Sequence, residues 1–247
     1  MIYAISDLHL GFAVEKPMDV FGSEWFDHAS KIKANWESTV TGEDTVLIAG
    51  DISWATRLQE VLPDMAFIEG LPGKKILYPG NHDMWWSSVN KLKPMFETIT
   101  FIKHGFILVE DMPICGSRGW FCPDYIDFDS HDEKIYKREI MRVEASLNEA
   151  MRAGHTDITL VMHFPPIGKN STTSGFISLI KQYPITNVIY GHIHNQDDIK
   201  CTLQGVHDGV EYTLVSGIAL DFNPIQIMAA SLPQINVANK IEMGKKE

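Results

Sequence analysis

Histidine, aspartate and asparagine side chains stand at the ends of five short apolar runs in this sequence. These residues are Asp7, His9, Asp51, Asn81, His82, His163, His192 and His194. Imidazole nitrogens, carboxylate oxygens and amide oxygens are ligands of transition metals. A lone residue of this kind is more often structural than a ligand, but a set at so many separate strand ends predicts a metal centre.

The densest of these stretches is Tyr78-Pro79-Gly80-Asn81-His82-Asp83, which delivers an amide, an imidazole and a carboxylate consecutively. A buried core has no need for three such side chains in a row. For this stretch alone, a polar turn at the end of a strand is the ordinary alternative. The other strand ends favour the chemical interpretation.

Strands and helices must position these side chains. Strands are expected at residues 2–5, 45–49, 75–78, 157–162, 187–190 and 225–229, with extended segments at 99–109 and 114 and a hairpin formed by 199–206 and 210–216. Helices are expected at 24–40, with Trp25, Ile32 and Trp36 on one stripe, and at 55–69 and 84–96. A period of two residues would point Asp7 and His9 the same way. Open α/β sheets bind ligands at the carboxyl ends of their strands, which places the site there.

A long helix is expected at residues 130–153, after an acidic segment that could be mistaken for a second metal site. Ser130 and Glu133 have the spacing of a capping box, and acidic residues suit the first turn of a helix. The predicted buried face consists of Ile140, Val143, Leu147 and Met151, and Gly154 ends the helix. The segment 127–132 is therefore interpreted as a solvated loop and helix start.

Length and composition indicate one domain over residues 1–230, followed by a weakly patterned tail at 231–247. The chain has 247 residues, 45% of them hydrophobic, and no segment resembling a linker. Its formal net charge of -11 would repel a polyanion, which makes nucleic acid a disfavoured partner. The oligomeric state is left open by the sequence.

The three cysteines, Cys115, Cys122 and Cys201, lack the spacing of metal ligands and are odd in number. A reducing compartment suits them better than a disulfide framework, and at least two should be buried thiols. The sequence enters a strand at once and contains no run long enough to cross a bilayer. We therefore expect a cytoplasmic protein with no membrane partner.

The motifs Asp-x-His, Gly-Asp, Gly-Asn-His-Asp, a lone His and Gly-His-x-His occur in this order between residues 7 and 194. In this order the set resembles the calcineurin-like metallophosphoesterase superfamily, in its branch of small bacterial-type phosphohydrolases. The resemblance implies an α/β fold, α+β in some schemes, built as a four-layer α/β/β/α sandwich of two mixed β-sheets flanked by helices. It also implies a first metal held by Asp7, His9 and His194, a second held by Asn81, His163 and His192, a bridging Asp51, and a non-ligand catalytic pair formed by His82 and Asp83.

The ligand set itself indicates an anionic substrate. Two carboxylates, five neutral ligands and a hydroxide cancel only three of the four positive charges on two divalent ions. Two metals about 3.5 to 4 Å apart bind phosphoryl oxygens and acidify a bridging water for in-line attack. We therefore expect a phosphoesterase that hydrolyses small phosphomonoesters or phosphodiesters without a phosphoenzyme.

The departing oxygen of such a substrate needs a proton. His82 is the candidate donor, with Asp83 holding its tautomer and keeping it protonated near pH 7. Asp83 is equally suited to be the N-cap of the helix that follows.

The ligand types suit Mn, Fe, Zn, Co or Ni, with Mn first and Fe next. Substrate contacts are expected in the loops over the metals, where Arg118 could hold a phosphate oxygen. Trp54, Trp85, Trp86 and Phe164 follow ligand positions closely. They could form a slot for a base or an aryl group, or they could brace the ligand turns as core.

Two alternatives remain at this point. The superfamily includes nucleases, against which the acidic charge and the absence of a basic stripe weigh; a salt-sensitive gel shift would favour one. A non-catalytic metal-binding scaffold should have lost ligands or the histidine of Gly-Asn-His-Asp, and this chain has lost neither.

Overall fold

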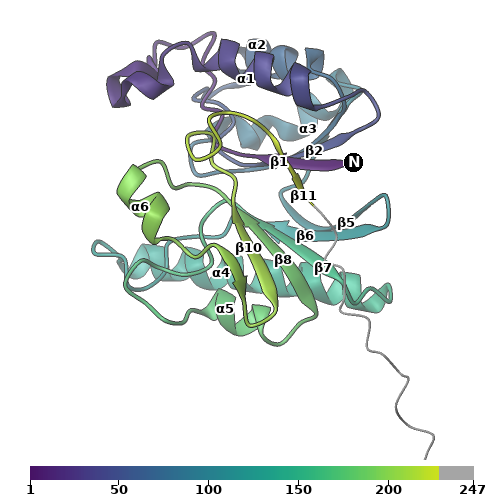
Figure 1. Ribbon diagram of the computed structural model, residues 1–247, viewed down its shortest axis with the longest axis vertical. Coiled ribbons are helices and arrows are strands. Elements are labelled where there is room, and N and C mark those ends of the chain that lie inside the picture. Colours follow the sequence, from purple (N-terminus) through teal and green to yellow (C-terminus); the bar gives the residue numbers. More distant parts are fainter. Residues whose placement is uncertain (228–247) are drawn as a thin grey trace, which may run out of the picture.

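Two β-sheets face one another in the computed structural model, which describes residues 1–227 (Figure 1). The first sheet has five strands in the order β11-β1-β2-β3-β4. They are β1 (Ile2–Ile5), β2 (Thr45–Ala49), β3 (Lys74–Tyr78), β4 (Ile99–Phe101) and β11 (Ile225–Ile227). β1 to β4 run parallel, and β11 pairs antiparallel with β1. The carboxyl ends of β1, β2 and β3 therefore meet at one edge of the sheet.

The second sheet has six strands in the order β5-β6-β7-β8-β10-β9. They are β5 (His104–Val109), β6 (Met112–Ser117), β7 (Ile158–Met162), β8 (Ile185–Tyr190), β9 (Gly205–His207) and β10 (Val210–Leu214). β6, β7, β8 and β10 are parallel, and β5 and β9 are antiparallel edge strands. The ends of β7 and β8 carry His163 and His192 to the same region as the first sheet's motifs.

Helices cover the outer faces of both sheets (Figure 1). The first sheet is covered by α1 (His28–Thr39), α2 (Leu58–Gly70) and α3 (Val89–Leu92), and the second by α4 (Ser130–Arg152) and α5 (Gly175–Ile180). The connections contain α6 (Gln196–Cys201) and the 3-10 helices Met18–Phe21, Ser23–Trp25, Met84–Ser88 and Lys93–Met95. The predicted sandwich of two mixed sheets flanked by helices is confirmed.

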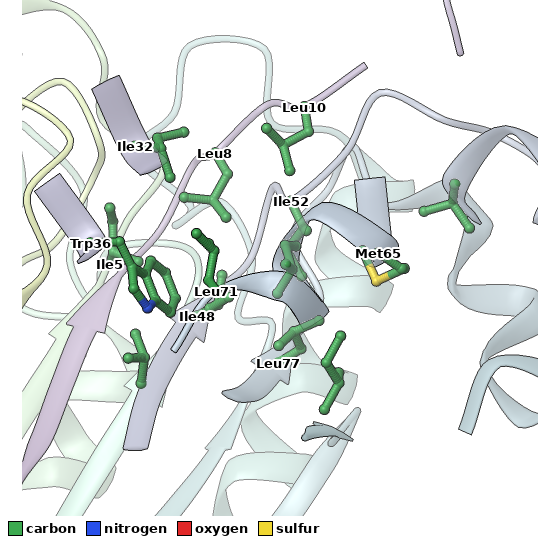
Figure 2. Close-up of a cluster of buried hydrophobic side chains, with 14 of the residues drawn as sticks. Ile5, Leu8, Leu10, Ile32, Trp36, Ile48, Ile52, Met65, Leu71 and Leu77 are labelled. Atoms are coloured by element: carbon green, nitrogen blue, oxygen red, sulfur yellow. The ribbon is translucent and has the colours of Figure 1, made fainter. Parts of the chain in front are cut away.

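Three clusters of buried apolar side chains hold these layers together. The cluster between the first sheet and its helices includes Ile5, Trp36, Ile48, Met65 and Leu77 (Figure 2). The cluster between the two sheets includes Leu47, Tyr78, Ile114, Val161 and Ile189. The cluster between the second sheet and its helices includes Val143, Leu147, Leu160, Phe176 and Val188. Because β2 and the second half of β3 are buried on both faces, residues 46–49 and 76–78 are continuous apolar runs rather than alternating ones.

The structure divides several segments that were predicted as single elements. Residue Asp27 adopts φ 50°, so a 3-10 turn carries Trp25 and α1 begins only at His28. Residues 84–96 form two 3-10 turns around the short α3. The segment 99–109 supplies β4 to one sheet and β5 to the other, and residues 199–201 belong to α6 instead of the hairpin.

The N-cap residue of the long helix α4 lies one position earlier than predicted. Its N-cap is Asp129, whose carboxylate accepts hydrogen bonds from the amides of His131 and Asp132. Val143 and Leu147 are buried as predicted, but Met151 is 40% exposed and the buried stripe continues through Ala150. Among the described residues the possible metal-binding groups lie elsewhere, so the acidic segment 127–132 is part of the helix start.

Other features can be compared only within residues 1–227. The predicted tail and the last two residues of the predicted strand 225–229 lie outside the described part of the chain. Cys115 and Cys122 are buried free thiols, as predicted, and Cys201 is exposed. In the described part of the chain, every helix is too short or too polar to span a bilayer.

Candidate metal centre

The loops after β1, β2, β3, β7 and β8 bring the predicted ligands together. The possible ligand atoms form two groups, each with its atoms within 4.8 Å of one another: Asp7, His9, Asp51 and His194, and Asp51, His163 and His192. Asp51 belongs to both groups, as a bridging ligand must. Asn81 lies beside the second group, with its Oδ1 2.9 Å from Nε2 of His163.

The surroundings of one oxygen of Asp51 indicate whether these residues fit metal ions. Its Oδ1 accepts a hydrogen bond of 2.8 Å from the amide of His82. Its Oδ2 is buried and has no hydrogen-bond partner among the described residues, although Nε2 of His163 lies 3.3 Å away and Nε2 of His9 lies 3.8 Å away. A buried carboxylate oxygen without a donor is costly, and a cation between it and the imidazoles removes that cost. The residues present therefore fit two cations that share Asp51.

The possible ligand atoms of the first group also lie close together. Nε2 of His9 and Nε2 of His194 lie 3.2 Å apart, and Nε2 of His194 lies 3.4 Å from Oδ1 of Asp7. Ser6 donates a hydrogen bond to Oδ2 of Asp7, and the amide of His192 donates to the same oxygen at 3.0 Å. These bonds from neighbouring groups fix the orientation of the carboxylate.

The orientation of His163 is set by backbone groups on both sides. Its Nδ1–H donates to the carbonyl oxygen of Ala49 at 3.0 Å, which leaves Nε2 free to act as a ligand. Its own amide donates to the carbonyl of Arg118, and its carbonyl accepts from the amide of Gly191. The second sheet thus holds the histidine while the first sheet selects the tautomer.

The backbone at the strand ends differs from the strand geometry assumed for Asp7 and His9. Both residues have left-handed conformations, φ 59° and 43°, and Asp51 and His192 share this conformation at 50° and 73°. Alternation along a strand is therefore not the reason that Asp7 and His9 point to one centre. The backbone turns sharply at the end of each of these strands, and the turn directs the side chain towards the centre.

Two glycines allow the turn that carries Asp51 to lie close to the turn after β3. A Cβ atom built on Gly80 would lie 2.0 Å from Oδ1 of Asp51 and 2.2 Å from its amide nitrogen. Gly50 has φ 92°, and a Cβ there would lie 2.7 Å from the amide of Gly80. Only residues without a side chain allow this approach.

Burial decides the protonation of most histidines in the centre. It lowers the pKa of His9 and of His192 well below the ordinary value, so both are neutral at pH 7. Burial also lowers the pKa of His163, but the carboxylate of Asp51 outweighs it and raises that pKa to about 9. Burial acts to raise the pKa of Asp51, and His163 beside it holds that pKa well below the usual range. A cation would take the place of the proton between these two residues.

His82 lies at the entrance of the centre, outside both ligand groups. Its side chain is 36% exposed, its Nε2 lies 4.0 Å from Oδ2 of Asp51, and its ring packs on Trp54 with centroids 4.3 Å apart. Burial lowers its pKa below the ordinary value for histidine. The carboxylate of Asp51 acts to raise this pKa but does not outweigh burial, and Asp83 is not among the groups that raise it, so the prediction that Asp83 keeps His82 protonated is not supported.

Asp83 has neither of its two predicted roles. Its Oδ1 accepts hydrogen bonds from the amides of Ile52 and Ser53 and from the indole of Trp85, and its Oδ2 accepts from the amide of Gly80. In the described structure none of its hydrogen bonds goes to the imidazole of His82, and it makes no side-chain cap of the 3-10 turn that follows. Asp83 instead fastens together the two turns that carry Asp51 and Asn81.

Arg118 supports the centre through its main chain. Its carbonyl accepts hydrogen bonds from the amides of His163 and Phe164. Its guanidinium stacks on Trp120 at 4.3 Å and lies 3.9 Å from the buried carboxylate of Glu139 on α4. The guanidinium of Arg118, predicted to hold a phosphate oxygen, thus lies beside the carboxylate of Glu139 inside the protein.

Aromatic side chains surround the histidine ligands and brace them. Trp54 stacks on His9 with centroids 4.9 Å apart, Trp25 contacts His194 at 5.7 Å, and Phe164 contacts His192 at 4.2 Å. Trp85 and Trp86 are buried in the core beneath the first sheet's helices. Trp85 and Trp86 are therefore core, which is the second of the two interpretations of their sequence positions, and Trp54 and Phe164 pack on candidate ligands.

The sequence interpretation missed the aromatic residues after β6. Phe121 stacks on Tyr125 with centroids 4.3 Å apart and an angle of 18° between the rings, and it also contacts His192 at 5.5 Å. The signal is present in the sequence, since Trp120, Phe121 and Tyr125 lie within six residues after Gly119 and close to Arg118, where substrate contacts are expected.

Known proteins resemble this chain in sequence and fold. The gene 66 protein of Mycobacterium phage D29 is 27% identical over 197 residues, which cover 79% of each protein. The phosphopantetheinyl hydrolase PptH of Mycobacterium tuberculosis has the same fold, with a TM-score of 0.52 and 19% identity over 87% of this chain and 88% of that one. A protein of unknown function from Aquifex aeolicus matches 91% of this chain and 94% of its own, with 21% identity and a TM-score of 0.49.

The family model of the calcineurin-like phosphoesterases matches residues 1–196, a span that contains both ligand groups. The chain therefore belongs to the calcineurin-like phosphoesterase family and is a hydrolase of phosphate esters.

Proposed function

We propose that this chain is a dinuclear metal-dependent phosphoesterase that acts on small phosphomonoesters or phosphodiesters. The observation that carries the proposal is the convergence of two ligand groups on Oδ2 of Asp51, which is buried and has no hydrogen-bond donor among the described residues. An isolated structural histidine or aspartate would find such a partner within the protein. A shared carboxylate between two sets of imidazoles is what a pair of cations requires.

Each ligand group has a distinct role in the proposal. Asp7, His9 and His194 would hold one ion, Asn81, His163 and His192 the other, and Asp51 both. When bound, divalent ions such as Mn, or failing that Fe, supply Lewis acidity towards phosphoryl oxygens and a more acidic water as the nucleophile. The protein contributes the rigid turns that fix seven side chains before the substrate arrives.

His82 is the residue proposed to assist the leaving group. It is partly exposed at the entrance and belongs to neither ligand group, so its imidazole can reach a bound ester. Stacking on Trp54 holds the ring in one orientation. A proton delivered from this position would convert a departing alkoxide into an alcohol.

The test is hydrolysis by protein stripped of metal and then supplied singly with Mn, Fe, Zn, Co, Ni or Mg. The substrates are p-nitrophenyl phosphate and bis-p-nitrophenyl phosphate, and the variant is Asp51→Asn. We expect turnover to return with a transition metal and to fall by at least about a hundredfold in the variant. The ratio of the two rates would assign the site to monoesters or diesters.

Asp208→Asn is the matched control. Asp208 has φ 51°, close to the 50° of Asp51, but it lies in an exposed hairpin turn away from the ligands. The control should retain activity. Protein that binds two ions per chain but hydrolyses neither ester with any metal would overturn the proposal and favour the scaffold alternative.

A further inference from the structure

A large pocket opens beside the metal centre, on the side of the second ligand group. Its volume is about 700 Å³, and its lining includes His192 and His194 together with Phe121, Tyr125, Phe164 and Ile193. Because two of the lining residues are proposed ligands, the pocket borders the centre. A phosphate group alone would fill only a small part of it, since pockets of this volume hold molecules of the size of drugs.

The wall nearest the ligands is aromatic. Phe164 contacts the ring of His192 at 4.2 Å, Phe121 packs edge-on against Phe164 at 4.7 Å, and Tyr125 stacks on Phe121 at 4.3 Å. This wall begins at a ligand histidine and continues outward without a charged side chain in the stack.

The outer rim exposes apolar surface to solvent. Tyr125 is 45% exposed and Ile126 is 92% exposed, and both line the pocket. Exposed apolar side chains grouped at the mouth of a pocket are a feature of ligand-binding sites. A ligand that reaches from the phosphate site to this rim would remove them from water.

The lysine that lines the pocket is already paired with a carboxylate. Lys169 is the only lysine or arginine among the described lining residues, and its Nζ lies 2.5 Å from Oδ1 of Asp198 on α6. Asp124 accepts a hydrogen bond of 3.0 Å from the amide of Asn170. No cation of the described lining is left to receive a second phosphate or the backbone of a polynucleotide.

We infer that the substrate is a phosphoester whose alcohol or phenol part is bulky and apolar, and that this part lies against Phe121 and Tyr125. The inference rests on the proposed function and names its substrate class. In the reaction, the oxygen of one water forms a bond to phosphorus and the bond from phosphorus to the ester oxygen breaks. The ester oxygen takes a proton, and the apolar alcohol leaves through the aromatic rim.

The test compares 2-phenylethyl phosphate with ethyl phosphate, because the two alcohols have similar acidity and differ in apolar size. Phosphate release by the metal-loaded enzyme should give a kcat/KM at least about tenfold higher for the phenylethyl ester. In Tyr125→Ala and Phe121→Ala this ratio should fall to about one. Tyr125 is partly exposed, so its variant should fold even if Phe121→Ala does not.

Leu108→Ala is the control, since Leu108 is 47% exposed on β5 and pairs with Pro113 at the end of β6 opposite to Arg118. The control should keep the preference. An unchanged ratio in Tyr125→Ala, or a wild-type ratio near one, would overturn the assignment of the pocket while leaving the phosphoesterase proposal intact.

A binding measurement separates the two proposals. 2-Phenylethyl phosphonate and ethyl phosphonate, which cannot be hydrolysed at the P–C bond, are titrated into metal-loaded protein by calorimetry. Tighter binding of the phenylethyl compound that is lost in Tyr125→Ala supports the pocket even without turnover. Equal binding of the two phosphonates would refute the pocket regardless of activity.

Discussion

Asp83 holds the turn that carries Asp51 against the turn that carries Asn81. Its Oδ1 accepts from the amides of the two residues after Asp51, at 2.9 and 3.1 Å, and its Oδ2 accepts from Gly80 at 2.7 Å. The carboxylate is buried and every one of these donors points at it. The last aspartate of Gly-Asn-His-Asp therefore positions Asp51, the proposed bridging ligand.

Asp83→Asn should damage the metal centre and the fold together. The amide NH₂ that replaces one carboxylate oxygen would face an N–H group, which should lower the free energy of unfolding by about 1–3 kcal/mol. Urea denaturation and metal titration would measure the two effects. Asp129→Asn is the control, because asparagine serves as well as aspartate at the N-cap of α4. A variant that is stable and fully metal-loaded but has a shifted pH profile would show that Asp83 acts on His82 instead.

His82→Gln should lower kcat without removing metal. His82 belongs to neither ligand group, so metal analysis should still find two ions per chain. The loss in kcat should be about a hundredfold for ethyl phosphate and smaller for p-nitrophenyl phosphate, because nitrophenolate departs without a proton. His131→Gln, an exposed substitution on α4, is the control. Equal losses on both esters would argue against leaving-group assistance.

Single ligand substitutions should remove one ion each. His194 belongs to the first group and His192 to the second, so His194→Ala and His192→Ala should each reduce the bound metal from two ions to one. Elemental analysis after gel filtration would count the ions. If His192→Ala loses both ions while His194→Ala loses none, the two groups do not form independent halves of a dinuclear centre.

Gly80→Ala should abolish metal binding or folding. The new methyl group would lie 2.0 Å from Oδ1 of Asp51, and the nearby backbone gives it no room to move away. Overpacking of this kind costs about 3 kcal/mol or more. Gly70→Ala is a matched control, because a Cβ at Gly70 meets nothing within 4 Å. Thermal unfolding of both variants, with and without Mn, would compare them, and equal melting temperatures would contradict the predicted clash.

The stability of the protein should depend on pH through Lys75. This lysine is buried, donates hydrogen bonds to the carbonyls of Glu69 and Leu71 and to Thr98, and burial lowers its pKa from 10.5 to about 8. Between these pH values the unfolded chain binds the proton and the folded chain does not, so stability rises with pH. The free energy of unfolding of the wild type minus that of Lys75→Met should therefore rise from pH 8 towards pH 10.5.

Urea denaturation at several pH values would measure that difference. Lys74→Met serves as the control, because Lys74 is the exposed neighbour of Lys75 on the same strand. A difference between wild type and Lys75→Met that stays constant over this range would show that the burial of Lys75 does not shift its pKa.

The sequence by itself was enough to name the candidate ligand residues and to predict the sandwich. Asp7, Asp51, His163 and His192 each follow an apolar run that became a buried parallel strand, and parallel strands bring such ends to one edge. Because short apolar runs and the residues that end them are local features, they can be identified without knowledge of the contacts. Extended structure over residues 99–109 was predicted as well, but an apolar run does not reveal that β4 and β5 belong to different sheets.

Tertiary structure alone decided how the supporting residues are used. Two of the four hydrogen bonds of Asp83 come from amides 30 and 31 residues away, so its sequence neighbourhood, which places it beside His82, was misleading. Arg118 lies beside Glu139, and Phe121, on which Tyr125 stacks, contacts His192 only because the loop after β6 comes close to the end of β8. Ligand chemistry is a property of single residues, whereas the partner of a carboxylate or an aromatic ring depends on which distant segments the packed sheets bring into contact.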